Sequence, residues 1–256
     1  MLPVNVLNFI RQNFWAVIVG FGILVGFLQI LPPLLVRQDI VSRGGEFVLA
    51  QPSNYRDEFI QYLPRAREVF DGHFPPRGVY ADEGSEPSPL NPLPPLLFSF
   101  FIFLFGGNMN AAYLGAQFVF PLIVFLLFYS LASLMLKSRT RALFVAFIAT
   151  LTQIPQMIFN YVGRDYLGIM VKKFIPFIRT PISKMYLARM DDPLLTYPIF
   201  IGAILAFYAF WVKPRITTAI LSGLLTGLLA YTYLHHWLFL TVFVGVLFLR
   251  VLFFER

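Results

Sequence analysis

The sequence predicts an all-α polytopic membrane protein with about six transmembrane helices and further short helices along the outer leaflet in its first outer loop. Of the 256 residues, 58% are hydrophobic and the mean hydropathy is +0.71, whereas soluble domains are about 45–50% apolar. The apolar residues form runs of about 18 to 28, which is enough to cross roughly 30 Å of hydrocarbon. Charged residues lie almost entirely between these runs, apart from Arg250.

Six apolar runs within a single membrane domain, 1–256, are candidate spans. They cover residues 14–36, 109–136, 142–159, 194–212, 216–234 and 237–254. In order, the chain has a first span (14–36), a first outer loop (37–108), two spans (109–159), a basic second outer loop (160–192) and the remaining spans (193–256). The apolar run 94–106 is only about twelve residues long, too short to cross, so we expect a re-entrant or surface-lying helix there.

The distribution of positive charge predicts the orientation of the chain. Short basic connectors favour the cytoplasmic side, and the turns 137–141 and 213–215 are of this kind. With the N-terminus inside, loops 37–108 and 160–192 and the turn at 235–236 lie at the outer face. The second outer loop carries six cations against this rule, so we expect them to hold phosphate. We therefore predict a membrane protein with a cytoplasmic N-terminus and with loops 37–108 and 160–192 on the outer face.

The first outer loop holds nine of the thirteen acidic residues. Apolar residues recur there at helical spacing, which predicts an amphipathic helix over 55–71 on the outer leaflet, bent at Pro64. Asp57 and Glu58 fall in its first turn, after Asn54 as a candidate cap. Such acids either favour the helix macrodipole or act as a general base or metal ligand at the edge of the bilayer. Both interpretations stay open at this point.

Charge and cysteine content narrow the classes of function. The formal net charge is +7 and Cys is absent, so disulfides and thiolate metal sites are excluded. The positive charge suits anionic lipid headgroups or a phosphate-bearing substrate, whereas the scattering of basic residues between spans argues against nucleic acid as a partner. The apolar run from Phe14 is too long for a cleavable signal peptide and lacks a small-residue cleavage site.

Several motifs resemble segments of integral-membrane glycosyltransferases of the C superfamily, such as protein mannosyltransferases, aminoarabinose lipid A transferases and the oligosaccharyltransferase catalytic subunit. The motif that is similar to their first outer loop is Asp57-Glu58-x-x-x-Tyr62-x-x-x-x-Arg67-Glu68-x-x-x-Gly72-His73-x-Pro75. The next element of that fold is similar to Pro94-Pro95-Leu96 followed by Gly106-Gly107. Uncharacterised bacterial members have stretches like Arg189-x-x-x-Pro193-x-x-Thr196-x-Pro198 and Gly223-x-x-x-Gly227-Leu228-Leu229-x-Tyr231-x-Tyr233-x-x-x-Trp237. The resemblance covers most of the chain and rests on the order of the motifs and their shared outer location.

The resemblance implies a polyprenyl-phosphate-linked sugar donor, an acceptor that is a glycan, lipid or protein, and catalysis by a loop carboxylate, Asp57 or Glu58. It also adds Tyr62 to the substrate-binding residues, and it implies a bacterial inner membrane as the location, with the active-site loops on the outer face. Alignment on Tyr62, Arg67 and Gly72 places Glu58, not Asp57, where relatives have Asp. Either Asp57 acts after a one-residue shift, or Glu58 acts instead, or the site is inactive. Because relatives continue with further spans and a soluble domain, the resemblance further implies a short form or a fragment.

A divalent cation is a further expectation. Relatives carry a second acid, sometimes a metal ligand, near the position of Asp165; the alternative is a simple surface ion pair with Arg164. Asp191 and Asp192 form a third acidic position, for which helix N-capping is the alternative. If acids such as Asp57 and Asp165 converge, oxygen ligands favour Mg or Mn over Zn.

Cations of the second outer loop are candidate ligands for the lipid phosphate. Arg179 and Arg189 come first, because relatives place an Arg near this region, and Lys184 comes next. Their alternative is snorkelling into headgroups. His235 and His236 are candidates for a contact with the donor phosphate, and a hydrogen-bonded role at the interface is the alternative.

Two other classes of function compete with the enzyme. A transporter of a lipid-linked anion predicts charged residues inside the spans, where this chain has almost none. A non-catalytic membrane scaffold predicts that Asp57, Glu58 and Asp165 are scattered and solvated. The enzyme instead requires the surface helix, the basic loop and the His turn around one cavity open to the outer leaflet.

Overall fold

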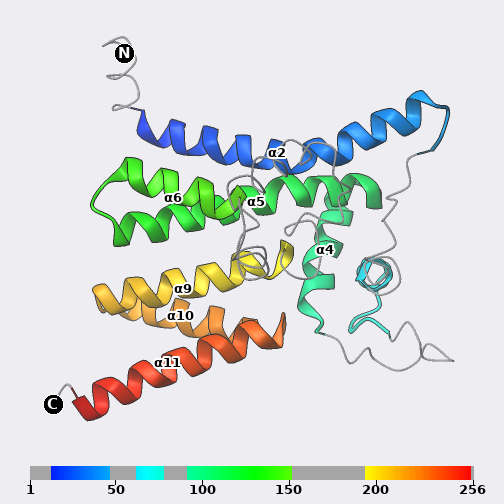
Figure 1. The fold of residues 1–256 in the computed structure, drawn as a ribbon. Helices are drawn as coiled ribbons and strands as arrows, with labels where there is room; N and C mark the ends of the chain where they lie inside the picture. Colours follow the sequence, from blue (N-terminus) through cyan, green and yellow to red (C-terminus); the bar gives the residue numbers. More distant parts are fainter. Residues whose placement is uncertain (1–12, 47–61, 78–90, 152–193, 255–256) are drawn as a thin grey trace, which may run out of the picture. The chain divides into compact units, whose positions relative to one another are not determined.

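The computed structural model describes residues 13–46, 62–77, 91–151 and 194–254. The regular elements in these ranges are helices (Figure 1), in agreement with the predicted all-α class. The chain divides into two compact units. Unit 1 consists of the described parts of Met1–Pro52 and Leu114–Ala188, and unit 2 consists of those of Ser53–Tyr113 and Arg189–Arg256.

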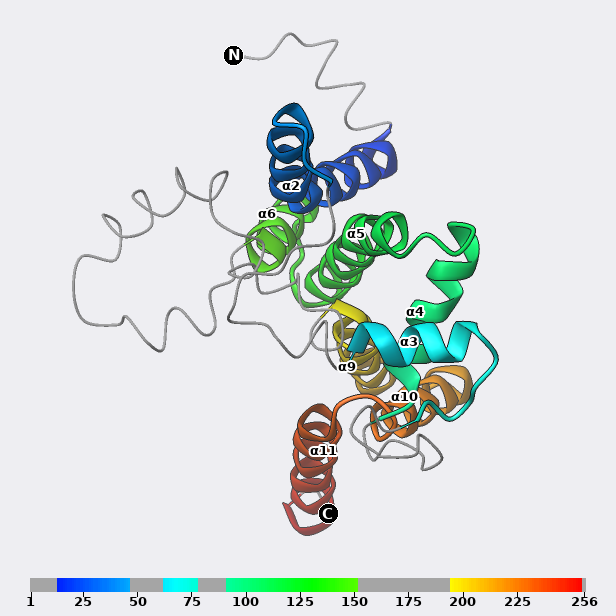
Figure 2. The ribbon, with the colours of Figure 1, turned by 90° about the vertical axis from the view of Figure 1, so that its right-hand side faces the viewer.

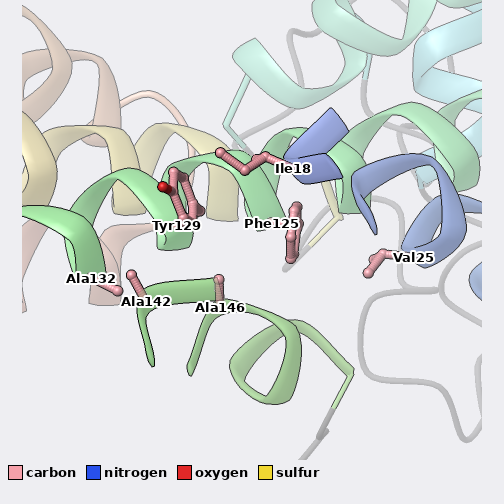
Figure 3. Close-up of a cluster of buried hydrophobic side chains, with 7 residues drawn as sticks. All are labelled: Ile18, Val25, Phe125, Tyr129, Ala132, Ala142 and Ala146. Carbon is pink, nitrogen blue, oxygen red and sulfur yellow. The ribbon is translucent and has the colours of Figure 1, made fainter. Parts of the chain in front are cut away.

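Unit 1 is built from three apolar helices. They are α2 (Phe14–Ser42), α5 (Met109–Met135) and α6 (Arg139–Leu151). The first residues of α5, up to Tyr113, belong to unit 2. All three contribute side chains to one buried core (Figure 3), which contains Ile18, Val25, Phe125, Tyr129, Ala132, Ala142 and Ala146. Three of these seven residues are alanines, one on α5 and two on α6, so small side chains face the core from both helices.

Helices α2 and α5 run in opposite directions, and a glycine of α2 lies against the backbone of α5. Trp15 packs edge-on against Tyr129 with ring centroids 6.3 Å apart, and Phe27 packs against Phe118 at 5.3 Å. A Cβ added to Gly26 would lie 2.8 Å from the carbonyl oxygen of Phe118. The distance between the two helices therefore depends on the absence of a side chain at Gly26.

Helix α2 is longer than the predicted span 14–36. Its first part, Phe14–Leu31, is long and apolar enough to cross a membrane, and the helix continues to Ser42. It ends just before Gly44, whose φ of +79° is typical of a helix C-terminus. Pro32 and Pro33 lie inside it, and such prolines are a usual cause of the bend that α2 shows in Figures 1 and 2.

Unit 2 contains five helices in the described part of the chain. They are α3 (Leu63–Phe70), α4 (Leu93–Leu104), α9 (Tyr197–Val212), α10 (Ile216–Leu229) and α11 (Leu234–Phe254). Helix α3 packs on α4, and α10 packs on both α9 and α11 (Figures 1 and 2). The buried core between the last three helices contains Ala203, Leu229 and Leu240.

Three helices are long and apolar enough to cross a membrane, which identifies the chain as a membrane protein. These segments are Phe14–Leu31 in α2, Met109–Met135, which is all of α5, and Leu234–Phe253 in α11. Helices α9 and α10 are apolar but have 16 and 14 residues, fewer than the roughly 20 that a crossing needs. Of the predicted span 142–159, the residues after Leu151 lie outside the described part. The described helices thus include three candidate spans, and the predicted count of six is not confirmed.

Within each unit, segments predicted to share a side of the membrane lie at the same end. In unit 1 the guanidinium of Arg139 lies 5.9 Å from the ring centroid of Phe14, so the start of α2 meets the basic turn 137–141. In unit 2 the N–H of Leu93 donates to the carbonyl oxygen of Tyr231 at 3.2 Å, so the first outer loop meets the α10–α11 turn. The assignment of either end to a side of the membrane stays a prediction.

Candidate functional site

Unit 2 joins three segments that lie far apart in the sequence, and we call them together the junction. It consists of residues 62–77 with α3, residues 91–107 with α4, and residues 230–237 around the α10–α11 turn. The side-chain amide of Asn91 donates a hydrogen bond to the carbonyl oxygen of Thr232. Together with the bond from Leu93 to Tyr231, it holds the start of α4 against the turn.

Arg65 is the most unusual side chain of the junction, because it is charged and only 1% exposed. Its Nη2 donates to the carbonyl oxygen of Asn91 at 3.0 Å. Burial of a guanidinium costs free energy unless the group is hydrogen-bonded, so this hydrogen bond offsets part of the cost of burying Arg65. Since Asn91 also bonds to Thr232, two side chains connect α3 to the α10–α11 turn.

The end of α10 differs from the predicted span 216–234. The helix ends at Leu229, and Thr232, which is fully buried, donates its hydroxyl hydrogen to the carbonyl oxygen of Leu229 at 2.9 Å. The carbonyl groups of Tyr231 and Thr232 then accept bonds from residues 91–93 instead of from the next helical turn. Contacts with the start of α4 thus take the place of helical hydrogen bonds at these two carbonyl groups.

Arg67 links the exposed side of α3 to the end of α4. Its Nε donates to the carboxylate of Asp71 at 3.0 Å, and its Nη1 donates to the carbonyl oxygen of Gly107 at 3.3 Å. Its guanidinium lies 4.9 Å from the ring centroid of Phe70. Gly107 has a φ of +84°, which glycine adopts without strain. Two segments of the family-like motifs, at Arg67 and at Gly106-Gly107, are thus in direct contact.

Glu68 closes the loop that follows α3. Its Oε2 accepts the backbone N–H of Arg77 at 2.6 Å, and its carbonyl oxygen accepts the N–H of His73 at 2.9 Å. Gly72 lies between them with a φ of +94°. Glu68 and Gly72 therefore shape the loop 72–77, which gives these two motif residues a structural role.

A groove of about 480 Å³ lies between α3 and α4. Apart from one serine its lining is apolar, and it contains Val69, Phe70, Leu96, Leu97, Ser99, Phe100 and Phe103. Ser99 donates its hydroxyl hydrogen to the carbonyl oxygen of Leu96 within α4. Phe70, which lines the groove, also contacts the guanidinium of Arg67. The groove thus combines an apolar lining with a guanidinium beside it that is paired with the carboxylate of Asp71.

His235 and His236 lie in the first turn of α11 rather than in the turn between two spans, which corrects the predicted position. His236 stacks on Phe200 of α9, with centroids 4.5 Å apart and planes 15° apart, and also contacts Tyr197 and Tyr233. His235 is exposed and contacts only Tyr233 among the ring pairs described. Successive helical residues point about 100° apart, and the two imidazoles share the contact with Tyr233, whereas only His236 packs against α9 in the ring pairs described.

Most of the predicted site residues lie outside the described part of the chain. They are Asp57, Glu58, Asp165, Arg179, Lys184 and Arg189. Tyr62 lies inside it, just before α3, with right-handed helical dihedral angles (φ −81°, ψ −47°). Of the predicted helix 55–71, the described part forms α3, in which Pro64 occupies the first turn, a position that proline favours.

Three residues of the junction were not among the predicted site residues, namely Arg65, Asn91 and Thr232. Arg65 carried a weak signal, because it follows Tyr62 by three residues and so lies next to the apolar stripe of the predicted helix. Asn91 and Thr232 carried none, because their bond joins positions 141 residues apart. Such a pair becomes visible only once the segments are placed in space.

The described residues contain no group of three or more His, Asp or Glu side chains that could hold a metal ion. The predicted ligands Asp165 and Asp57 lie outside these ranges. The divalent cation, Mg or Mn, therefore stays a prediction.

Comparisons of the chain with known protein families, with curated proteins and with solved structures gave no match. The resemblance to the C superfamily accordingly rests on the sequence motifs. The structure adds that the segments carrying Arg67, Gly107 and Tyr231 belong to one compact unit and meet in the junction.

Proposed function

We propose that the protein is a membrane glycosyltransferase that moves a sugar from a polyprenyl-phosphate donor to an acceptor at the outer face of the membrane. The observation that carries this proposal is the junction. The enzyme hypothesis required the surface helix and the His turn to surround one site, and α3 and the α10–α11 turn are connected through Arg65, Asn91 and Thr232. The third required element, the basic loop 160–192, lies outside the described residues.

The groove between α3 and α4 supports a lipid-linked substrate. Its apolar lining fits an isoprenoid chain, and Arg67, which is paired with Asp71, lies beside it. Arginine binds phosphate in a two-point manner, so in this proposal the donor phosphate replaces Asp71 as the partner of Arg67 and is also held by Arg179, Lys184 and Arg189 of the basic loop. This assignment of Arg67 extends the substrate-binding residues predicted from the sequence.

The proposed chemistry is a single displacement at the anomeric carbon of the sugar. The carboxylate of Asp57 or Glu58 takes the proton of the acceptor as the acceptor atom forms its bond to that carbon. The bond between the carbon and the phosphate oxygen breaks, and the polyprenyl phosphate leaves with the electron pair. Arginine side chains stabilise its negative charge, and the configuration at the anomeric carbon inverts.

The proposal is tested with a photoreactive polyprenyl-phosphate analogue and the purified protein. We expect saturable labelling that is lost in Arg179→Ala and Arg189→Ala, reduced in Arg67→Ala, and retained in the double variant Asp57→Asn/Glu58→Gln. Peptides carrying the label should come from residues 62–77 or 91–107. A photoreactive phosphatidylglycerol serves as the control for general attraction to anionic lipids.

Labelling no stronger than that by phosphatidylglycerol, and unchanged in every variant, would overturn the proposal and favour a non-catalytic scaffold.

A second measurement tests which side of the membrane each turn faces. Because the chain has no Cys, a single cysteine at His235 or Lys213 can be probed in spheroplasts with an impermeant maleimide without background. We expect the His235→Cys variant to react from outside and the Lys213→Cys variant to react only after permeabilisation. The reverse pattern would contradict an outer-face enzyme.

A further inference from the structure

The α5–α6 turn of unit 1 concentrates positive charge that the proposed enzyme does not use. Lys137, Arg139 and Arg141 are spaced two residues apart, and all three are exposed. The first turn of α6 contains no acidic residue, and the ion pair described for the chain lies elsewhere, between Arg67 and Asp71. Like charges repel at this spacing, so an anion at the turn would relieve the repulsion.

An aromatic platform lies next to these cations. The guanidinium of Arg139 lies 5.9 Å from the ring centroid of Phe14. Tyr129 packs against both Phe14 and Trp15, at 6.4 and 6.3 Å between centroids. Trp15 nevertheless stays 73% exposed, in the kind of position that tryptophan favours at the level of lipid headgroups.

Exposed apolar side chains flank the same turn along the helices that lead away from it. Met135, at the end of α5, is 60% exposed, and Phe144, one turn into α6 from Arg141, is 65% exposed. The surface therefore changes from cationic at the turn to apolar along α5 and α6. A phospholipid has the matching order of a phosphate headgroup followed by acyl chains.

We infer that this end of unit 1 is a binding site for an anionic phospholipid. Arg139 and its two basic neighbours hold the lipid phosphate, with the planar guanidinium fixed by its contact with Phe14. The acyl chains lie along the exposed apolar side chains of Trp15 and Phe144. A soluble phosphate ion would leave this apolar surface uncovered, whereas a phospholipid covers it.

The second basic connector provides an internal control for this inference. Residues Lys213 and Arg215, between α9 and α10, are also exposed, and the cation–ring contacts described for the chain include neither of them. General attraction of anionic lipid to basic turns predicts similar behaviour at both connectors. A specific binding site instead predicts that the preference for anionic lipid over zwitterionic lipid depends on the residues of the α5–α6 turn.

The experiment uses the full chain in lipid nanodiscs with Trp15 as the single reporter, after Trp211→Phe and Trp237→Phe. Brominated phosphatidylglycerol or brominated phosphatidylcholine is mixed at equal fractions into a phosphatidylcholine bilayer, and quenching of Trp15 is compared. An attraction of about 1 kcal/mol per cation corresponds to roughly fivefold enrichment, so we expect the anionic lipid to be enriched at least about fivefold. The variant Arg139→Gln/Arg141→Gln removes two of the three cations and keeps Lys137, so it should lower this enrichment by at least about fivefold.

Three further variants complete the test. Lys213→Gln/Arg215→Gln removes two charges from the other connector and should leave the enrichment unchanged, whereas Phe14→Leu should reduce it and Arg139→Lys should retain part of it. Equal quenching by both lipids in the unmodified turn would overturn the inference. So would an equal loss of enrichment in the two charge-removal variants, or displacement of the lipid by inorganic phosphate.

Discussion

Polar side chains have different roles in the two units. In unit 1, hydroxyl groups bond within their own helices, because Ser130, Ser133 and Thr150 donate to carbonyl groups three or four residues earlier. In unit 2, Arg65 and Asn91 make bonds that connect different segments. Unit 1 is therefore held together by apolar packing and close backbone approach, whereas the junction of unit 2 depends on directional bonds. Function at a membrane surface requires defined polar geometry, which favours unit 2 as the location of the site.

The largest expected effect concerns the buried arginine of the junction. Arg65→Ala removes a charged hydrogen bond and leaves the carbonyl oxygen of Asn91 without this donor, so we expect a loss of about 2–3 kcal/mol in the free energy of unfolding. Arg67→Ala, on the same helix but 45% exposed in its ion pair, should cost about 1 kcal/mol or less. The measurement is unfolding by SDS in mixed micelles, followed by Trp237 as the single tryptophan. Equal losses would show that burial of Arg65 does not matter.

The next effect tests backbone approach in unit 1. Gly26→Ala places a methyl group 2.8 Å from the carbonyl oxygen of Phe118, so α2 and α5 must separate, at a cost of about 1–2 kcal/mol. Gly20 has no atom within 4 Å of its added Cβ, so Gly20→Ala should be neutral or slightly stabilising. Unfolding in SDS is followed by Trp15 as the single tryptophan. No difference between the two variants would contradict close packing at Gly26.

A stabilising substitution should sharpen the contrast. Gln117 is 3% exposed, and within the described part of the chain its side-chain amide has no hydrogen-bond partner. Gln117→Met keeps the length of the side chain and removes this cost, so we expect a gain of about 1–2 kcal/mol in the free energy of unfolding. Gln38→Met, at an exposed position of α2, is the control and should change little. A loss of stability in Gln117→Met would show that unit 1 also relies on a polar contact.

The two histidines should differ by a smaller amount. His236→Ala removes the stacked contact with Phe200, which is worth about 1 kcal/mol. His235→Ala removes an exposed ring and should have almost no effect on thermal unfolding measured by circular dichroism. If His235→Ala instead abolishes labelling by the polyprenyl-phosphate analogue while His236→Ala does not, the exposed imidazole is the one that contacts substrate.

The smallest expected effect is in the hydroxyl groups of unit 1. Ser130 donates to the carbonyl oxygen of Leu126 at 2.8 Å, a bond inside one helix that contributes little. Ser130→Ala should therefore change the free energy of unfolding by about 0.5 kcal/mol or less. A loss above about 1 kcal/mol would assign Ser130 a contact between helices and would break the distinction between the units.

The sequence was sufficient to predict the membrane class and much of the helix order, because apolar runs set both. It was less accurate at two helix ends. Helix α2 continues through Pro32 and Pro33 to Ser42, and α10 ends at Leu229, before residues 231–232, which bond to the start of α4. Neither helix end follows from local helix propensity. Proline normally stops a helix, yet α2 continues past two prolines. Tyrosine does not normally stop a helix, yet α10 does not extend to Tyr231.

The candidate site could be predicted only in part for a similar reason. The motif residues Arg67 and Gly107 were selected through a family resemblance, and they prove to be in contact. Arg65 was missed because an arginine in an amphipathic surface helix is expected to point to water. Asn91 and Thr232 were missed because a single polar residue in a proline-rich stretch or a helix end has no periodic signature.

The bond between Asn91 and Thr232 also has a consequence for biosynthesis. Its two ends are 141 residues apart, so at about 5–20 residues per second the ribosome adds the second end roughly 7 to 28 s after the first. During this interval α3 and α4 have emerged, while the turn that will hold them has not been translated. We expect this segment to stay accessible to proteases and chaperones until α10 and α11 are inserted.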